Sequence, residues 1–305
     1  MVPAKPWQVD AVVRLALSVI ICAYAGSLVF SLLHFAGDPS KVASRLFFPV
    51  AALGLVCMAC ALVLLSRPLN PETLFSRMVM IMAFGYGGLL LSFWGQHLSG
   101  MPATDLSLPR MTITTLSFQG AGLLLVGQSL REQGMTWTEA FGLGERRRRA
   151  LALGLVAAVV FVPLGWQLQK LSALLMPHLP FLHLEPKEQT AVQALRDSLS
   201  LGAQLTMGAT AVFLAPVAEE VLFRGILYSI LKQLGRPKMA LWVASLLFAV
   251  VHVNMATFIP LTLLAVVLTL LYEYSGNLLA PIAAHVLFNA VNFGMLLVQQ
   301  HYKGA

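Results

Sequence analysis

The sequence predicts an all-α polytopic membrane protein, a bundle of about eight to nine transmembrane helices. Of its 305 residues, 58% are hydrophobic and only 11% are charged, whereas soluble domains are about 25% charged. Several apolar runs reach the roughly 20 residues that a helix needs to span a bilayer. These runs are continuous and do not alternate with period two, which disfavours a membrane β-barrel.

Short polar pieces divide the apolar sequence into nine runs. We expect spans near 11–35, 45–66, 77–98, 108–130, 150–176, 203–234, 239–254, 257–275 and 278–299. Whether 239–254 crosses fully decides between eight and nine spans. No small-residue cleavage site follows a short apolar stretch near the start, so we expect the first span to be retained.

Two longer polar pieces stand out between the spans. Residues 131–150 include four consecutive arginines, Arg146 to Arg149. Residues 177–199 mix proline, histidine and charge, and their second half has amphipathic helical spacing. We expect both pieces to lie along the membrane surface.

The basic residues predict the orientation. If the Arg146–Arg149 loop is cytoplasmic, the alternation of nine spans places 12 basic residues inside and seven outside. This bias favours a cytoplasmic N-terminus, and it explains the net charge of +7 without a nucleic-acid partner. The basic, Leu/Ala-rich, multi-span character suggests a bacterial inner membrane.

The three cysteines do not indicate a disulfide framework. Cys22, Cys57 and Cys60 all fall in apolar runs, where free cysteine behaves as a small buried hydrophobe. The Cys57-x-x-Cys60 spacing resembles a redox or metal pair, but the chain has no second pair, so we interpret these residues as packing residues.

The stretch APVAEEVLFRG, residues 215–225, places three ionisable side chains inside an apolar run. An ionisable residue within a span indicates a functional site, because its burial is costly. Glu220 and Arg224 are four residues apart and share a helix face, so we expect a neutralising, structural pair. Glu219 is turned about 100° away and needs another partner or a watery cavity.

Two later motifs offer partners for Glu219. FAVVH places Phe248 and His252 one helical turn apart, and HVLFN does the same for His285 and Asn289. A carboxylate with a nearby histidine can hold and deprotonate water. A second histidine and an asparagine can donate hydrogen bonds to an oxyanion. This inventory favours hydrolysis.

The three motifs resemble those of the CPBP family of intramembrane proteases, also called CAAX-processing or Abi proteins, relatives of the type II CAAX prenyl endopeptidases. EEVLFR fits E-E-x-x-x-R, FAVVH fits F-x-x-x-H and HVLFN fits H-x-x-x-N, in the family's order. The resemblance implies that Glu219 and His252 activate the water, whereas His285 and Asn289 bind the oxyanion. Glu220 and Arg224, with Phe248, would be supporting residues. This is the pattern of a glutamic endopeptidase without a metal.

The resemblance also predicts two regions, motif-free spans in residues 1–135 and a CPBP-like catalytic core in residues 136–305. The expected partners are the lipid bilayer and a peptide or protein substrate in the membrane, prenylated or not. The sequence does not predict an oligomeric state.

Three alternatives stay open. Zinc is one, since histidine and glutamate are competent ligands, although the chain has no H-E-x-x-H motif. A catalytically silent scaffold or immunity protein that binds a peptide is the second. A proton-coupled transporter is the third, but the polar residues crowd one half of the chain and lack the repeats that a transporter would show.

One geometric conflict follows from the simple span picture. It places His252 near the outer end of its helix, but His285 only two turns from the inner end of the next. A 239–254 helix that starts outside the bilayer, or is tilted or broken, would remove the conflict. We expect Glu273, further along the chain, at an interface or facing the cavity.

Overall fold

The computed structural model describes residues 7–69, 71–101, 107–144, 146–175 and 201–304, and in these ranges every regular element is a helix. This confirms the predicted all-α class. The chain forms two compact units: an amino-terminal unit of residues 8–129, and a carboxyl-terminal unit of residues 130–305 with residues 1–7.

The amino-terminal unit consists of long apolar helices joined by short pieces. Its elements are α1 (Val9–Ala36), the 3₁₀ helix η1 (Pro39–Lys41), α2 (Phe47–Leu65), the 3₁₀ helix η2 (Pro71–Thr73), α3 (Leu74–Ser99), α4 (Leu108–Thr115), the π-helical η3 (Leu116–Gly120) and α5 (Ala121–Glu132). Small residues let α2 and α3 approach closely: a Cβ on Gly88 would lie 2.8 Å from Met58 Cγ. Close packing through small residues is typical of helix association in lipid.

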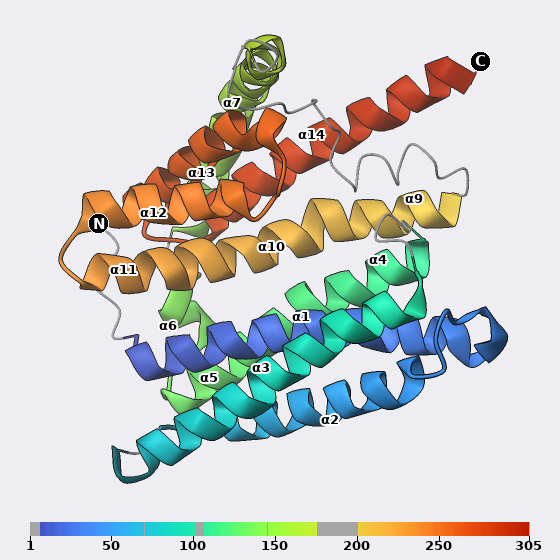
Figure 1. Cartoon of the computed structure of the whole chain (residues 1–305). Coiled ribbons are helices and arrows are strands. Elements are labelled where there is room, and N and C mark those ends of the chain that lie inside the picture. The colour runs from blue at the N-terminus through green and yellow to red at the C-terminus, as the bar shows by residue number, and fades with distance from the viewer. Residues whose placement is uncertain (1–6, 70, 102–106, 145, 176–200, 305) are drawn as a thin grey trace. The chain divides into compact units, whose positions relative to one another are not determined.

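The carboxyl-terminal unit is built around one long helix. Residues 201–233 pass without a break through α9 (Leu201–Gly208), the π-helical η5 (Ala209–Leu214), α10 (Ala215–Glu220), the π-helical η6 (Val221–Tyr228) and α11 (Ser229–Gln233). The other helices of this unit are α6 (Trp137–Phe141), α7 (Arg147–Leu175), α12 (Pro237–Val250), α13 (Met255–Ser275) and α14 (Leu279–Gly304). Of these, α6, α12, α13 and α14 contact the long helix, and α7 packs against α13 and α14. Figure 1 shows α12 beside the α10–α11 part of the long helix.

Seven of the described helices are long and apolar enough to cross a membrane, fewer than the eight or nine predicted. Two predicted spans account for the difference. The helical run 108–132 is not among the seven, and it contains threonine, serine, glutamine and arginine side chains. The predicted span 239–254 is the 14-residue α12, which ends at Val250. At 1.5 Å per residue it is about 21 Å long, short of the roughly 30 Å hydrocarbon core.

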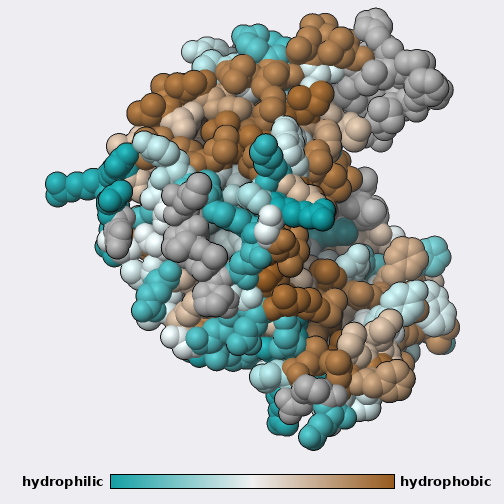
Figure 2. All heavy atoms as spheres, turned by 90° about the vertical axis from the view of Figure 1, so that its left-hand side faces the viewer, coloured by the Kyte–Doolittle hydropathy of each residue, from teal (hydrophilic) through white to brown (hydrophobic). Residues whose placement is uncertain are grey.

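The surface is apolar, as a membrane protein requires. Large hydrophobic side chains such as Phe75, Val159 and Val253 are well exposed. Figure 2 shows hydrophobic residues, in brown, over wide areas of one face, with hydrophilic residues, in teal, gathered between them. The three cysteines are unpaired, so no disulfide links these helices.

The core of the carboxyl-terminal unit is packed closely enough to fix helix positions. A Cβ on Gly154 of α7 would lie 2.3 Å from the carbonyl oxygen of Ala280 in α14. The indole of Trp166 in α7 donates a 2.8 Å hydrogen bond to Asn292 Oδ1 in α14. This is the interhelical role that polar side chains have in membrane bundles. Buried side chains of α7, α13 and α14 form one cluster, made of Ala158, Phe161, Leu264, Leu268 and Ala284.

The predicted surface segment 131–150 contains the short helix α6. A reciprocal capping box starts it: Glu139 accepts hydrogen bonds from the backbone N–H and the hydroxyl of Thr136, and the Glu139 backbone N–H bonds to that hydroxyl. The bonds from Thr136 lower the pKa of the Glu139 carboxyl. The segment is held in the protein, because buried Phe141 fills the space that Gly225 leaves and its carbonyl accepts from Leu278 N–H. The second predicted surface segment, 177–199, lies outside the described residues.

Several basic residues gather at one end of this unit. Arg149 Nη2 lies 3.1 Å from the hydroxyl oxygen of Tyr274, and Lys232 pairs with Glu273 near the end of α13. The Arg146–Arg149 loop and the end of α11 therefore lie at the same end as the α13–α14 turn. The predicted alternation of spans requires the Arg146–Arg149 loop and the end of α11 to lie on the same side of the membrane.

Candidate active site

The buried pair of Glu220 and Arg224 forms the centre of the candidate site. Arg224 Nη1 lies 2.8 Å from Glu220 Oε1, and their side chains are 1% and 0% exposed. Arg224 also donates to the Ala265 carbonyl and to Thr269 Oγ1 of α13, at 3.1 and 3.4 Å. The predicted pairing at four-residue spacing is confirmed. Ala265 and Thr269 belong to no motif, so nothing in the sequence indicated that they contact Arg224.

Glu220 also holds His285 of α14, which the sequence analysis did not anticipate. His285 Nδ1 lies 2.8 Å from Glu220 Oε1, the same oxygen that Arg224 contacts. Because a carboxylate oxygen only accepts, Nδ1 carries the hydrogen of this bond. The ring is thereby oriented so that Nε2 faces Glu219 Oε2 at 3.8 Å.

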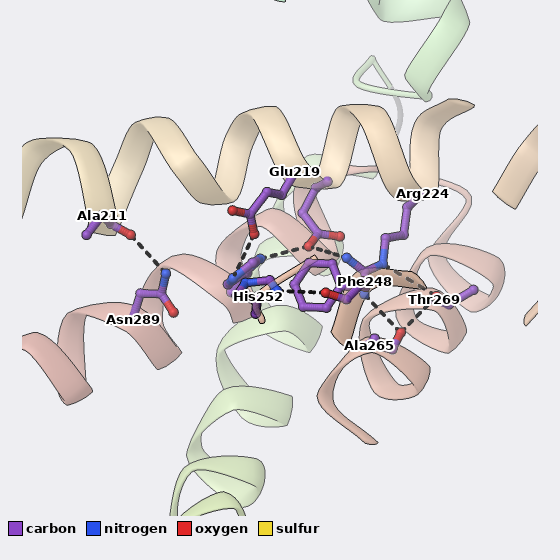
Figure 3. Close-up of polar contacts among 10 residues, drawn as sticks. Ala211, Glu219, Arg224, Phe248, His252, Ala265, Thr269 and Asn289 are labelled. Carbon is purple, nitrogen blue, oxygen red and sulfur yellow. Dashed lines mark hydrogen bonds and ion pairs between the residues drawn. The ribbon is translucent and has the colours of Figure 1, made fainter. Parts of the chain in front are cut away.

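Glu219 is less fully satisfied than Glu220. Its side chain is 16% exposed, and among the described residues its carboxylate has no hydrogen-bond partner, only His285 at ion-pair distance. Its other charged or titratable neighbours are His252, Glu220 and Arg224. In Figure 3 the Glu219 and Arg224 side chains project from the long helix toward His252 and Phe248. Glu219 therefore keeps lone pairs available for a water molecule.

His252 lies in the turn that follows α12. Its Nδ1 lies 2.6 Å from the Phe248 carbonyl oxygen. Since that oxygen only accepts, Nδ1 carries the proton, and Nε2 of the neutral ring is an acceptor. The next residue, Val253, has φ of +47°, a costly conformation for a β-branched residue. Asn254 then caps α13 by accepting from Thr257 N–H at 3.1 Å. The turn fixes both the place and the tautomer of His252.

The Phe248 ring is the platform on which the other groups meet. It is fully buried, with His252 and His285 at ring-centroid distances of 4.8 and 5.8 Å. The Arg224 guanidinium lies over the ring at 4.5 Å, where a cation–π interaction favours it. Since one ring contacts both histidines, the depth conflict of the simple span picture disappears. The reason is that α12, at 14 residues, is too short to span a bilayer and ends at Val250, before His252.

Asn289 occupies the turn after His285 on α14, and its amide contacts the long helix. Asn289 Nδ2 donates a 2.8 Å hydrogen bond to the Ala211 carbonyl in η5. Figure 3 shows this contact beside the Glu219 cluster. The motif residue therefore has a fixed partner on the helix that carries Glu219.

Two π-helical segments flank α10, which carries both glutamates. Wide turns of this kind are rare, and they often occur at functional sites, where they re-aim side chains. The first, η5, supplies the carbonyl that Asn289 contacts, and the second, η6, supplies Arg224. The sequence patterns predicted an ordinary helix here and carried no signal for either segment.

Glu273 belongs to a separate polar cluster. Its carboxylate accepts from the Tyr228 hydroxyl at 3.0 Å and from Lys232 Nζ. It therefore lies at a helix–helix interface, one of the two places predicted for it.

In the parts of the chain that the structure describes, no group of three or more histidine, cysteine, aspartate or glutamate side chains could hold a metal ion. In the candidate site, Glu220 Oε1 and His285 Nδ1 are hydrogen-bonded to each other.

Part of the chain, including these motifs, is similar to known proteins. Residues 201–291 match the family described as type II CAAX prenyl endopeptidase Rce1-like. An uncharacterized protein of Bacillus subtilis (strain 168), YpbD, is 40% identical over 78 residues. That similarity covers 24% of this chain and 37% of the relative. No solved structure matches.

The matched residues contain all three motifs together with the π-helical segments that flank α10. Residues 201–291 therefore resemble the Rce1-like type II CAAX prenyl endopeptidase family, as the motifs predicted.

Proposed function

We propose that the protein is an intramembrane endopeptidase of the glutamic type, which hydrolyses a peptide bond of a membrane-associated substrate. The observation that supports this most directly is Glu219. Its partly buried carboxylate lacks a hydrogen-bond partner among the described residues and lies beside two histidines that are held by fixed contacts. A carboxylate in such surroundings can bind a water molecule and act as general base.

In the proposed mechanism, Glu219 and the Nε2 atom of His252 hold the water. Glu219 takes one proton as the water oxygen bonds to the scissile carbonyl carbon. The C–N bond then breaks, and the same proton passes to the leaving nitrogen. Glu219 returns to its starting state, and the products are a carboxylic acid and an amine.

The developing oxyanion needs hydrogen-bond donors, and His285 and Asn289 are placed to supply them. His285 Nε2 can donate only when the ring is protonated, because Nδ1 already carries a hydrogen toward Glu220. Donors aimed at a developing charge are worth about 10²–10³-fold each.

The proposal includes no metal. The proposed substrate is a membrane-associated peptide or protein: the tail of a prenylated CAAX protein, a leader peptide or a membrane-anchored regulator. We further propose a bacterial cytoplasmic membrane with the N-terminus inside, supported by the basic residues gathered at one end of the carboxyl-terminal unit. Reporter fusions at residue 1 and within 177–199 would test the orientation. The proposal requires the run 108–132 to cross the membrane together with α1, α2, α3 and α7, and five crossings place the two fusions on opposite sides; fusions on the same side would contradict it.

The decisive experiment compares new peptide termini in the membrane proteomes of cells that express wild type or Glu219→Gln. The variant keeps the shape of the side chain but cannot accept the proton, so cleavage should fall about 10²–10⁴-fold while the folded yield persists. Glu273→Gln is the matched control, because Glu273 belongs to the separate cluster with Tyr228 and Lys232. It should leave the termini unchanged. Identical termini in wild type and Glu219→Gln would instead favour a catalytically silent protein that binds a peptide.

A further inference from the structure

The Ala211 carbonyl lies in η5, four residues before α10 begins at Ala215. The local sequence leaves this carbonyl without a backbone hydrogen-bond donor. In η5 each hydrogen bond runs from a backbone N–H to the carbonyl five residues earlier, and the last one joins the Ala215 N–H to the Thr210 carbonyl. In the same register the next donor would be the N–H of residue 216, directed at Ala211. That residue is Pro216, which has no N–H.

Asn289 of α14 takes the place of the missing donor. Its Nδ2 atom lies 2.8 Å from the Ala211 oxygen. Because a carbonyl only accepts, the amide must present its NH₂ group to the long helix, and the flipped orientation is excluded. One N–H of that group is used in the bond. The second N–H has no partner among the described residues.

We propose that Pro216 is a positioning residue for Asn289. By leaving the Ala211 carbonyl without a backbone donor, Pro216 makes that oxygen the fixed acceptor that sets the orientation of the Asn289 amide. The second N–H is then held in place for a ligand oxygen. The oxyanion role of that N–H rests on the proposed function, but the hydrogen bond and its dependence on Pro216 do not.

Pro216→Ala provides the test, because it restores the absent N–H without adding bulk. The new N–H either takes the Ala211 carbonyl in the π register or lets Ala215 N–H return to it in the α register. In both cases a backbone N–H competes with the Asn289 amide for that oxygen. Folding should persist, since alanine is favoured over proline inside a helix.

The first measurement does not require substrate. The chain has five asparagines, so protein labelled with ¹⁵N-asparagine in detergent micelles gives five side-chain amide signals, and Asn289→Ala identifies the one of interest. In wild type we expect one Asn289 amide proton to be protected from exchange with solvent. In Pro216→Ala that protection should fall by at least about tenfold. Unchanged protection would overturn the proposal.

The second measurement is a double-mutant cycle on a peptide that spans a cleavage site found by the comparison of termini. Asn289→Ala should lower kcat about 10²–10³-fold. Pro216→Ala should lower kcat about 10–100-fold, the cost of a misplaced group, with little change in KM. In the Asn289→Ala background Pro216→Ala should have no further effect, since it acts through the missing amide. An equal loss in both backgrounds would overturn the proposal.

Pro163→Ala is the matched control, since Pro163 is exposed within α7 and should affect neither measurement. The two arms also separate the two proposals. If wild type cleaves nothing but Pro216→Ala still releases the protected Asn289 proton, the proposed protease function fails and the positioning of Asn289 stands.

Discussion

Glu220 and His285 are joined by a 2.8 Å contact between Oε1 and Nδ1, through the carboxylate oxygen that also binds Arg224. Glu220 therefore does more than neutralise an arginine on its own helix. It connects the long helix to α14 and fixes which nitrogen of His285 faces Glu219. A residue expected only to support the structure thus orients a proposed catalytic histidine.

Arg224→Ala should destabilise the protein. Removing one partner of a buried pair leaves the other charge uncompensated, at a cost of about 3–5 kcal/mol, and Glu220 is fully buried. The folded yield and the thermal midpoint in detergent would measure the loss. Lys41→Ala is the control, because Lys41 and Asp38 form an exposed pair whose removal should leave stability unchanged. A stable but inactive Arg224→Ala protein would show that Arg224 acts in the chemistry instead.

Metal removal should not inactivate the enzyme. The proposed mechanism uses only Glu219, the two histidines and Asn289. Purified protein should therefore contain no stoichiometric zinc by elemental analysis and should keep its activity after prolonged treatment with a strong chelator. Activity that is lost and then restored only by zinc would contradict this. Glu219, His252 and His285 would then become the metal ligands.

Val253→Gly should stabilise the turn that carries His252. Val253 has φ of +47° and is 91% exposed, so glycine removes backbone strain and gives up little packing. We expect a gain of about 1 kcal/mol, since the left-handed region costs a non-glycine residue about 1–2 kcal/mol. Thermal unfolding in detergent would measure it.

The neighbouring Val251→Gly is the control for that variant, because Val251 is also exposed but has an ordinary φ of −66°. Glycine there should lower stability by about 0.5–1 kcal/mol. If both variants lower the thermal midpoint alike, Val253 is not strained.

Gly154→Ala should loosen the contact between α7 and α14. The added Cβ would lie 2.3 Å from the Ala280 carbonyl oxygen, so backbone must move. Overpacking of this kind costs about 1–3 kcal/mol, measurable as a lower thermal midpoint. Gly294→Ala is its counterpart on α14: a Cβ there meets nothing within 4 Å. Stability should stay level or rise by up to about 1 kcal/mol, and a loss as large as that of Gly154→Ala would show that the close approach is not the cause.

The sequence by itself determined the class of protein and the inventory of its site. Long apolar runs determine membrane helices because burial in lipid leaves the backbone no partner except itself. The pairing of Glu220 with Arg224 also followed from sequence, since residues four apart on a helix always lie on one face. Local periodicity is sufficient for features of this kind.

Only the tertiary structure decided how the groups from three helices meet. Three contacts join residues more than 30 positions apart: His285 with Glu220, His285 with the Phe248 ring, and Asn289 with Ala211. The Phe248 ring also contacts His252, so this packing brings the two histidines to one ring. These contacts depend on where α12 ends and on two π-helical segments, which shift the direction of every later side chain on the long helix. Neither helix length nor hydrogen-bond register leaves a periodic trace in the sequence, so packing between helices decides both.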